Sequence, residues 1–218
     1  AAMSPAPRWP VVLFDFDGTL LNTIDGIVAS YIYTWQTVSG RQVVRSEILP
    51  WIGRTLADVF ADEDPANAAE LEDVYLSHNA ATLANAVRQY DGISELAQEL
   101  VDAGIRTGVV TSKRRRNVLT GMQLAGLPSE MVLACAMDDT DRHKPDPTPL
   151  LTGLAALDAP VEGSLYIGDA IYDLQAAAAA GMDGIGVTWG AGSPAALRAQ
   201  PHVAVVDTVS QLRDHLIG

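Results

Sequence analysis

The sequence predicts an α/β fold in which a doubly wound, mostly parallel sheet carries an inserted all-helical segment. Short apolar runs that end in turn residues alternate with amphipathic segments, and this alternation is typical of parallel strands covered by helices on both faces. Residues 21–88 interrupt the alternation with helical patterns alone. A chain of 218 residues is long enough for a core domain with a smaller insertion.

The predicted strands are short apolar runs bounded by glycine, aspartate or threonine. Runs of this kind are typical of strands buried on both faces of a sheet. They lie at 11–14, 107–110, 132–137, 164–167, 184–187 and 203–206. The amphipathic segments predict helices at about 93–103, 116–125, 147–157, 171–180 and 209–217. We therefore assign residues 1–20 and 89–218 to a core domain and residues 21–88 to a helical domain.

The helical insertion (residues 21–88) shows three helical patterns. The first has one apolar face made of Ile24, Ile27, Val28, Tyr31, Ile32 and Trp35. A short helix is predicted at 55–60, and a long one at about 66–87 has a stripe made of Leu71, Val74, Tyr75 and His78. Because His78 shares its stripe with apolar residues, we expect it to be packed rather than functional.

The composition limits the classes of partner. A formal charge of −13 argues against general nucleic-acid binding, because a duplex would repel such a surface. The apolar runs are too short to span a membrane, and residues 1–10 lack the pattern of a secretory signal. The single cysteine, Cys135, lies in an apolar run and is expected to be a buried thiol. We expect a cytoplasmic protein, either a monomer or a homodimer.

Polar residues follow the predicted strands at the points where they end. In a parallel sheet these ends meet at one edge, where ligands bind. Any one of them is explained better as a turn residue, but four strand ends together favour a site. Clustered carboxylates suit Mg²⁺, and the remaining hydroxyl and ammonium suit phosphate oxygens. The residues are Asp15 and Asp17 after the first strand, Thr111 after the second, Arg142 and Lys144 near the third, and Asp169 after the fourth.

Four motifs in order give the chain a family resemblance. The segment Asp15-Phe16-Asp17-Gly18-Thr19-Leu20 resembles the signature of the haloacid dehalogenase superfamily, in its phosphatase branch. The helical insertion is similar to the cap of the phosphoglycolate-phosphatase-like group. The resemblance covers the chain from Val11 onward. The later motifs are similar to Thr111-Ser112, Lys144-Pro145-Asp146-Pro147, and Gly168-Asp169 with Asp173.

This resemblance implies a Rossmann-like core and a role for each aspartate. Asp15 would be the nucleophile that attacks phosphorus. Asp17 would protonate the leaving oxygen and then deprotonate the attacking water. Mg²⁺ would be held by the Asp15 carboxylate, the Asp17 backbone carbonyl and Asp169. Asp173 would act behind these ligands, holding a metal-bound water or Lys144.

The resemblance also implies which residues contact a small phosphorylated substrate. The Gly18 N–H would approach the phosphoryl group, Thr111 would bond one of its oxygens, and Lys144 would offset its charge. Ser112 and Lys113 are further candidates for binding the substrate.

Arg54 lies where related enzymes have a specificity loop, and it is also a candidate for binding the substrate. Trp189 and the Arg114–Arg116 run keep no assigned role, and we expect Arg115 and Arg116 to face solvent. Phosphoglycolate, pyrophosphate, sugar phosphates and nucleoside monophosphates all stay open as substrates.

Sister activities fit the motifs to different degrees. Dehalogenases lack an acid at the position of Asp17, and phosphonatases need a cap lysine that residues 21–88 do not contain. A phosphomutase of the beta-phosphoglucomutase type shares both aspartates and stays an alternative. A receiver domain of two-component signalling has a similar sheet edge and stays an alternative of another class. The helical insertion and Asp17 favour an enzyme.

Overall fold

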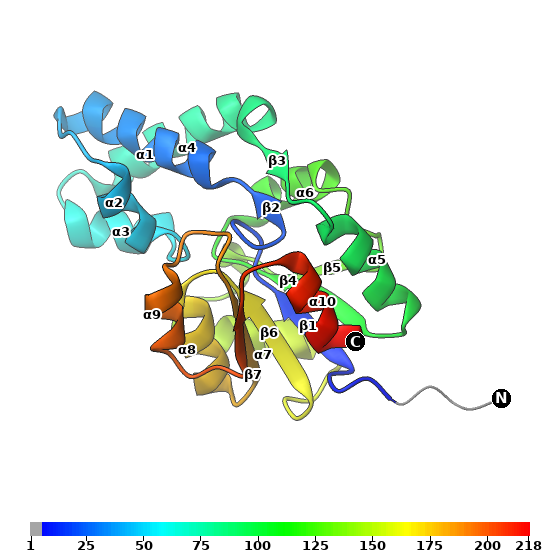
Figure 1. Cartoon of the computed structure of the whole chain (residues 1–218). Helices are drawn as coiled ribbons and strands as arrows, with labels where there is room; N and C mark the ends of the chain where they lie inside the picture. The colour runs from blue at the N-terminus through cyan, green and yellow to red at the C-terminus, as the bar shows by residue number, and fades with distance from the viewer. Residues whose placement is uncertain (1–5) are drawn as a thin grey trace.

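The computed structural model describes residues 6–218 and has a six-stranded parallel sheet at its centre (Figure 1). Every predicted strand is present within a few residues of its expected bounds. The strands are β1 (Val11–Phe14), β4 (Arg106–Val110), β5 (Val132–Cys135), β6 (Ser164–Gly168), β7 (Asp183–Val187) and β8 (Ala204–Val206). Their order is β5-β4-β1-β6-β7-β8, so β1 lies between β4 and β6 and pairs with both in parallel.

Helices cover both faces of the sheet, as the alternating pattern predicts. One face packs against α5 (Ile93–Asp102), α6 (Arg115–Leu124) and α10 (Val209–Ile217). The other packs against α7 (Thr148–Ala156) and α8 (Ile171–Ala180). The short helix α9 (Pro194–Arg198) was not predicted, although its start has a recognisable signal. Ser193 caps it by accepting from the Ala196 N–H, and Pro194 is suited to a first helical position.

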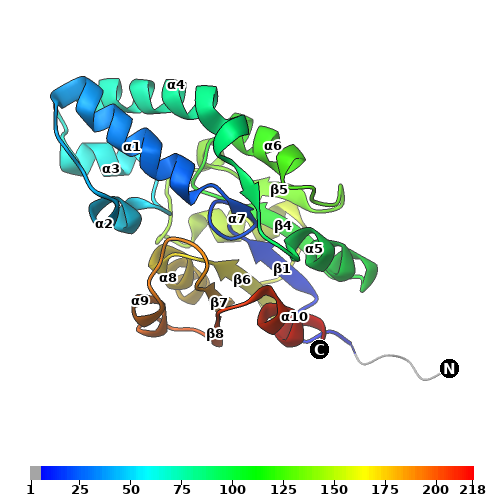
Figure 2. The same ribbon diagram turned by 45° about the horizontal axis from the view of Figure 1, so that its top comes forward.

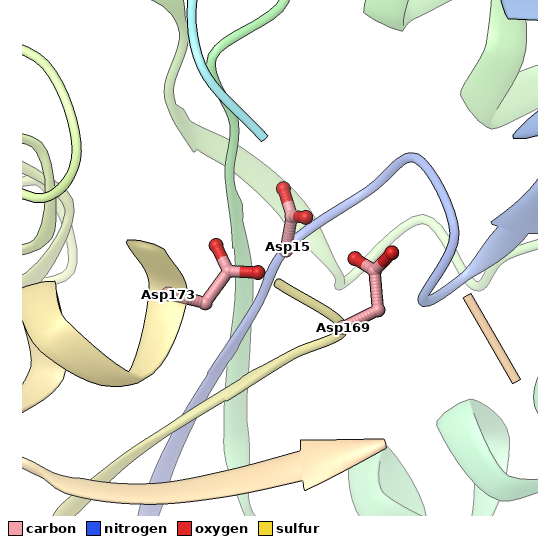
Figure 3. A group of neighbouring side chains, drawn as sticks. All are labelled: Asp15, Asp169 and Asp173. Atoms are coloured by element: carbon pink, nitrogen blue, oxygen red, sulfur yellow. The ribbon is translucent and has the colours of Figure 1, made fainter. Parts of the chain in front are cut away.

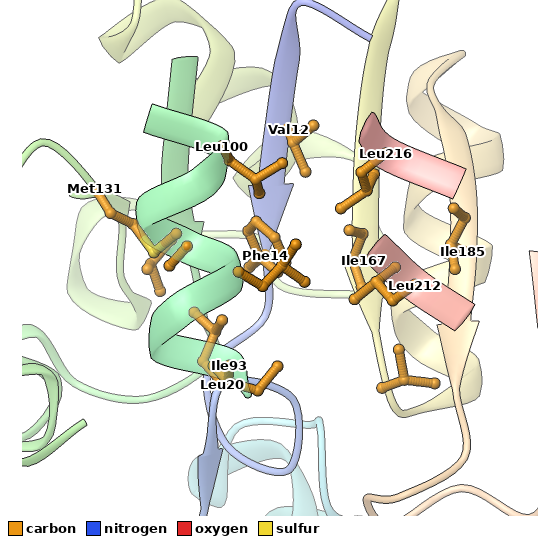
Figure 4. Close-up of a cluster of buried hydrophobic side chains, with 14 of the residues drawn as sticks. Val12, Phe14, Leu20, Ile93, Leu100, Met131, Ile167, Ile185, Leu212 and Leu216 are labelled. Atoms are coloured by element: carbon orange, nitrogen blue, oxygen red, sulfur yellow. The ribbon is translucent and has the colours of Figure 1, made fainter. Parts of the chain in front are cut away.

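The side chains of β1 alternate between two hydrophobic clusters. Val12 and Phe14 point into the cluster that contains residues of α5 and α10 (Figure 4). Val11 and Leu13 belong to the cluster on the α7 and α8 face. All four residues are buried, and burying an apolar side chain of this size contributes about 1.5–3 kcal/mol. The alternation fixes β1 in the middle of the sheet and therefore fixes where its last residue points.

The helical insertion lies beyond the end of β1, and two views of the molecule agree on this arrangement (Figures 1 and 2). The segments β2 (Leu21–Asn22) and β3 (Arg88–Gln89) pair antiparallel where the chain leaves the core and returns to it. The division into two domains at these points stays a prediction of the sequence. The insertion contains α1 (Ile24–Ser39), α2 (Arg45–Ile48), the 3₁₀ turn η1 (Leu49–Trp51), α3 (Leu56–Glu63) and α4 (Ala68–Ala86).

The insertion has an aromatic core of its own. Tyr31 lies at its centre, with ring centroids 5.3 Å from Trp51, 5.6 Å from Phe60 and 4.9 Å from Tyr75. Such tilted and edge-on pairs add about 0.5–1.5 kcal/mol each beyond the area they bury. Helices α1, α3 and α4 are therefore held as one packed unit.

Two expectations for this segment have different outcomes. Ile32 was placed on the buried face of α1, but it is 42% exposed, because it lies one residue round the helix from Tyr31. His78 is packed as expected: its Nδ1 lies 2.9 Å from the Ser30 hydroxyl, and its ring stacks on Tyr33. Cys135 is buried, also as expected. Among residues 6–218, no helix combines the length and apolar character needed to cross a bilayer.

Candidate active site

The predicted site residues meet at the carboxyl ends of the central strands. Asp15 follows the last residue of β1 and is still tied to the sheet, because its N–H donates to Ile167 O at 2.8 Å. Thr111 follows β4 and Asp169 follows β6. Lys144, from the loop before α7, reaches the same place, and its Nζ lies 3.1 Å from Asp15 Oδ1. Arg142 does not join them, since it is exposed and paired with Asp146.

Three buried carboxylates gather here: those of Asp15, Asp169 and Asp173 (Figure 3). One oxygen from each lies within 4.8 Å of the others. Burial, and then the charge of Asp173, raises the pKa of Asp15 well above its ordinary value. The same two causes raise the pKa of Asp169 to about 6. Three carboxylates with one ammonium leave an excess of negative charge, and a divalent cation with oxygen ligands fits that excess.

Lys144 is completely buried and all three of its N–H donors are used. Its Nζ lies 3.1 Å from Asp15 Oδ1, 2.7 Å from Asp173 Oδ1 and 3.0 Å from the Tyr166 hydroxyl. Burial alone would lower the pKa of this ammonium, but the charges of Asp15 and Asp173 outweigh it and raise the pKa. Lys144 is therefore a permanent positive charge at the side of Asp15.

The partners of Lys144 are themselves fixed. Asp173 accepts from the Ala170 N–H at 3.0 Å, in the first turn of α8. The Tyr166 hydroxyl donates to Val110 O at 2.7 Å and so offers its lone pairs to Lys144. Asp173 contacts Lys144 as the sequence suggested. Tyr166 was missed, because a tyrosine within a buried strand carries no sequence signal of a site.

The turn after β1 brings the backbone against Asp169. Gly18 has a φ of +77°, and a Cβ there would lie 2.3 Å from Asp169 Oδ2, so only glycine fits. The Gly18 N–H donates to Leu21 O at 2.9 Å. It is thus used within the turn, which differs from the expectation that it faces a phosphate.

Asp169 is held from two sides. Its Oδ1 accepts from the Thr19 hydroxyl at 3.1 Å, and its Oδ2 accepts from the Ala191 N–H at 2.7 Å. The loop after β7 comes close enough that a Cβ at Gly190 would overlap Asp169. Trp189 ties this loop to the first motif, because its indole N–H donates to Thr19 O at 3.1 Å. Ala191 was missed because it acts through its backbone N–H, and Trp189 had no assigned role because its partner, Thr19, lies in a segment distant in sequence.

Asp17 stands apart from the three buried carboxylates. Its Oδ1 accepts from the Thr23 hydroxyl at 2.7 Å and from Lys113 Nζ at 2.9 Å. Its side chain keeps 15% of its surface exposed, toward the pocket described below. A carboxyl group in this position can exchange a proton with a group that enters from the pocket.

Thr111 and Ser112 end β4 in different roles. Thr111 Oγ1 accepts from the Lys113 N–H at 3.1 Å, so its own hydrogen is free to donate. The Ser112 hydroxyl donates to Gly53 O at 2.8 Å, in the helical insertion. Ser112 therefore joins the two parts of the chain in this structure, whereas we expected it to contact the substrate.

Three of the remaining arginines singled out in the sequence are paired with carboxylates. Arg54 NH2 lies 2.5 Å from Asp62 Oδ2, within the insertion. Arg114 NH2 lies 2.5 Å from Glu72 Oε1, and this pair links α4 to the start of α6. Arg115 is paired with Asp139. Arg116 is exposed, as expected.

A pocket lies between the sheet edge and the insertion. The core contributes the reactive groups to its floor, and the insertion contributes aromatic, apolar and amide side chains. Two tyrosines and Asn79 come from the long helices α1 and α4, whereas Arg54 comes from the segment between η1 and α3. Its lining includes Asp15, Asp17, Thr111 and Lys113 from the core, and Tyr31, Ile52, Arg54, Leu56, Tyr75, Leu76 and Asn79 from the insertion.

This combination of a parallel α/β sheet, buried aspartates at the end of its central strand and an inserted helical segment agrees with the predicted class of hydrolase. The pattern that defines the haloacid dehalogenase-like hydrolases matches residues 12–187 of the chain. The chain therefore belongs to the haloacid dehalogenase-like hydrolase family, and the expectation of a phosphatase of this family is confirmed.

Relatives and solved structures agree with this assignment. The chain is 34% identical over 201 residues to pyrophosphatase PpaX of Bacillus mycoides, covering 92% of this chain and 94% of the relative. A predicted phosphatase from Clostridium acetobutylicum has a TM-score of 0.85 at 25% identity, with 94% and 97% of the two chains covered. A candidate phosphoglycolate phosphatase from Lactobacillus plantarum has a TM-score of 0.84 at 26% identity, with 95% and 99% covered.

Proposed function

We propose that the chain is a magnesium-dependent phosphohydrolase that cleaves a small phosphate monoester, or the related anhydride, through an aspartyl-phosphate on Asp15. The observation that carries the proposal is the group of three buried carboxylates around a single ammonium, that of Lys144. A structural cluster of this charge would be costly to bury, whereas a cation and a phosphate bound there would complete it.

The metal site would be formed by the Asp15 carboxylate, the backbone carbonyl of Asp17 and Asp169. The donors are all oxygens, which suits Mg²⁺. Bound there, Mg²⁺ would neutralise charge on the carboxylates and on the phosphoryl oxygens. Asp173 would hold Lys144 in place through their 2.7 Å contact.

The protein side chains would then divide the reaction into two steps. An Asp15 oxygen attacks phosphorus, and the bond to the leaving oxygen breaks as Asp17 supplies a proton to it. Asp17 next takes a proton from water, which attacks the aspartyl-phosphate and releases inorganic phosphate. Thr111 would donate to a phosphoryl oxygen throughout.

The alternatives now stand differently. A receiver-like signalling module is contradicted by the match to a hydrolase family over residues 12–187. A phosphomutase stays possible, since it differs in whether water or a sugar takes the phosphoryl group. The relatives' names make pyrophosphate and phosphoglycolate the substrates to test first.

The test is phosphate release by purified wild type and by Asp15→Asn, with magnesium or with a chelator. We expect release by the wild type with magnesium, and none above background in the other three combinations. Asp102→Asn is the matched control, because it removes the same charge from an exposed position on α5. Activity of folded Asp15→Asn equal to wild type would exclude Asp15 as the nucleophile.

A further inference from the structure

The space beside Asp17 is lined by a cation with unused donors. Lys113 Nζ donates to Asp17 Oδ1 at 2.9 Å, and among the contacts of residues 6–218 this is its one hydrogen bond. An ammonium has three donors, so two are left for a ligand. Because Asp17 is the group proposed to protonate the leaving oxygen, a cation bonded to Asp17 lies next to the leaving group.

Two tyrosines of the insertion, Tyr31 and Tyr75, line the same pocket as Asp17 and Lys113. Their residues are only 2% and 5% exposed, and both line the pocket. In the described part of the chain, neither hydroxyl has a hydrogen-bond partner. The fully buried polar side-chain atoms that lack a partner there are Trp35 Nε1 and Thr107 Oγ1 alone, so neither tyrosine hydroxyl is fully buried. Both hydroxyls must therefore reach open space, and the open space that both rings line is this pocket.

The tyrosine hydroxyls are suited to donate to an anion. Burial raises the pKa of both phenols, so they stay protonated at neutral pH. Tyr75 lines the same pocket as Asp17. A neutral donor beside Asp17 can bind an anionic oxygen without adding a charge that must be buried.

The rest of the lining is mixed. Ile52, Leu56 and Leu76 are apolar, whereas Thr55, Asn79 and Asn117 are polar and uncharged. Arg54 and Arg114 also line the pocket, but each is paired with a carboxylate of the insertion. Lys113 differs from both, because its partner is Asp17 itself.

We propose that Lys113, Tyr31 and Tyr75 form a leaving-group site for a compact group that carries its own negative charge. The favoured substrates are then inorganic diphosphate or a phosphorylated hydroxy acid, rather than esters of neutral alcohols. This inference rests on the proposed function. With diphosphate, Asp15 bonds to one phosphorus, the bridging P–O bond breaks, and the electron pair leaves on the second phosphate, which Lys113 and the tyrosines hold.

The test compares kcat/KM for four substrates in wild type and Lys113→Gln. Pyrophosphate and 2-phosphoglycolate carry a second anionic group on the leaving side, a phosphate or a carboxylate, whereas ethyl phosphate and p-nitrophenyl phosphate do not. Losing a charged hydrogen bond should lower kcat/KM about 10- to 100-fold for the first pair. We expect a loss of under about 3-fold for the second pair, since no such bond is made to them. Arg116→Gln, an exposed cation of the same run, is the matched control for net charge.

The double variant Tyr31→Phe/Tyr75→Phe keeps both rings and removes only the hydroxyls. We expect a loss of about 5- to 30-fold, again confined to substrates with a second anionic group on the leaving side. The ranking of pyrophosphate against 2-phosphoglycolate in wild type then identifies which source of negative charge the site prefers.

Two outcomes of the kinetic comparison would overturn the inference. An equal loss on all four substrates would mean that Lys113 only positions Asp17, and no loss on any would mean that it contacts no leaving group. Binding of pyrophosphate with magnesium to Asp15→Asn gives a readout without turnover, and adding Lys113→Gln should weaken it about 10-fold. Unchanged binding would also overturn the inference. Failure of the proposed function looks different, because Asp15→Asn would then still release phosphate.

Discussion

The two sides of the pocket are built in contrasting ways. At the sheet edge, all three donors of Lys144 and both oxygens of Asp169 have partners within the chain. On the side of the insertion, the hydroxyls of Tyr31 and Tyr75 have none among the described residues. The comparison teaches that the groups proposed to react are fixed by contacts within the chain, whereas the tyrosine hydroxyls proposed to face the rest of the substrate keep free hydrogen-bonding capacity.

The largest effect should come from Asp17, the one reactive carboxylate that lies on the boundary between the two sides. Asp17→Asn should lower kcat by about 10²–10⁴ for an alkyl phosphate, whose leaving oxygen needs a proton. The loss should be smaller for p-nitrophenyl phosphate, whose leaving group is stable as an anion. Measuring both substrates on one preparation checks this. An equal loss on both substrates would mean that Asp17 does not protonate the leaving oxygen.

Lys144→Met tests how strongly the buried carboxylates at the sheet edge depend on the ammonium of Lys144. It leaves the Asp15 and Asp173 carboxylates without their partner, and removing one member of a buried pair costs about 3–5 kcal/mol. Loss of the charge beside Asp15 should also lower kcat by about 10²–10³. Urea unfolding and steady-state kinetics measure the two effects.

A matched variant separates charge from packing at this position. Tyr166→Phe keeps Lys144 but removes the hydroxyl that lies 3.0 Å from its Nζ. It should cost about 1–3 kcal/mol of stability, because one Lys144 donor and Val110 O lose a buried partner. If Tyr166→Phe were as damaging as Lys144→Met, the charge of Lys144 would not be what holds the carboxylates together.

The excess of carboxylates predicts how stability depends on pH without metal. The pKa of Asp169 is about 6 in the folded chain, above its ordinary value of 3.8, so the folded state binds the proton more tightly. Stability of the metal-free protein should therefore fall as pH rises from about 4 to 6, by roughly 3 kcal/mol from this group. Asp15 acts in the same direction.

Magnesium should reduce this dependence, because a bound cation favours the ionised carboxylates. Urea unfolding at pH 5 and pH 7.5, with magnesium or a chelator, checks the expectation. Asp169→Asn in chelator is the control, since it removes the titrating group itself. Stability of the chelated wild type that rises toward pH 7.5 would contradict the idea of an uncompensated carboxylate group.

The sheet edge was the more predictable side, for a physical reason. Parallel strands end at a common edge, so residues that follow short apolar runs, such as Asp15, Thr111 and Asp169, must lie near one another. Contacts made through the backbone or through distant loops had no comparable signal. The Ala191 N–H on Asp169 and the Gly18 N–H on Leu21 O are examples, because every residue type except proline carries a backbone N–H.

The helices of the insertion were predicted, but the way in which their side chains line the pocket was not. Helical periodicity identified α1 and α4 and placed Tyr31 and Tyr75 on their buried faces. It could not show that both tyrosines line one pocket with Asp17, because the crossing of the two helices is set by tertiary packing. The same limitation applies to Ser112, whose partner Gly53 lies in a turn with no periodic pattern.

The smallest effect is expected at Arg54, which lies on the side of the insertion but is already paired with Asp62. Its contact with Asp62 is largely exposed, and exposed pairs are worth about 0–1 kcal/mol, so a substrate can compete for the guanidinium. A planar guanidinium suits a carboxylate at the far end of a longer substrate. Arg54→Ala should then lower kcat/KM about 3- to 10-fold for a three-carbon phosphorylated acid, and little for pyrophosphate.

Asp62→Asn should change kcat/KM in the opposite direction to Arg54→Ala, and it therefore tests the Arg54 prediction more strictly. It frees the guanidinium without removing it, and kcat/KM for the three-carbon acid should rise rather than fall. Pyrophosphate, which has no carboxylate for the guanidinium to bind, should be unaffected by either variant. If Asp62→Asn and Arg54→Ala lowered activity together on both substrates, the pair would be holding α3 in place, and Arg54 would select no substrate.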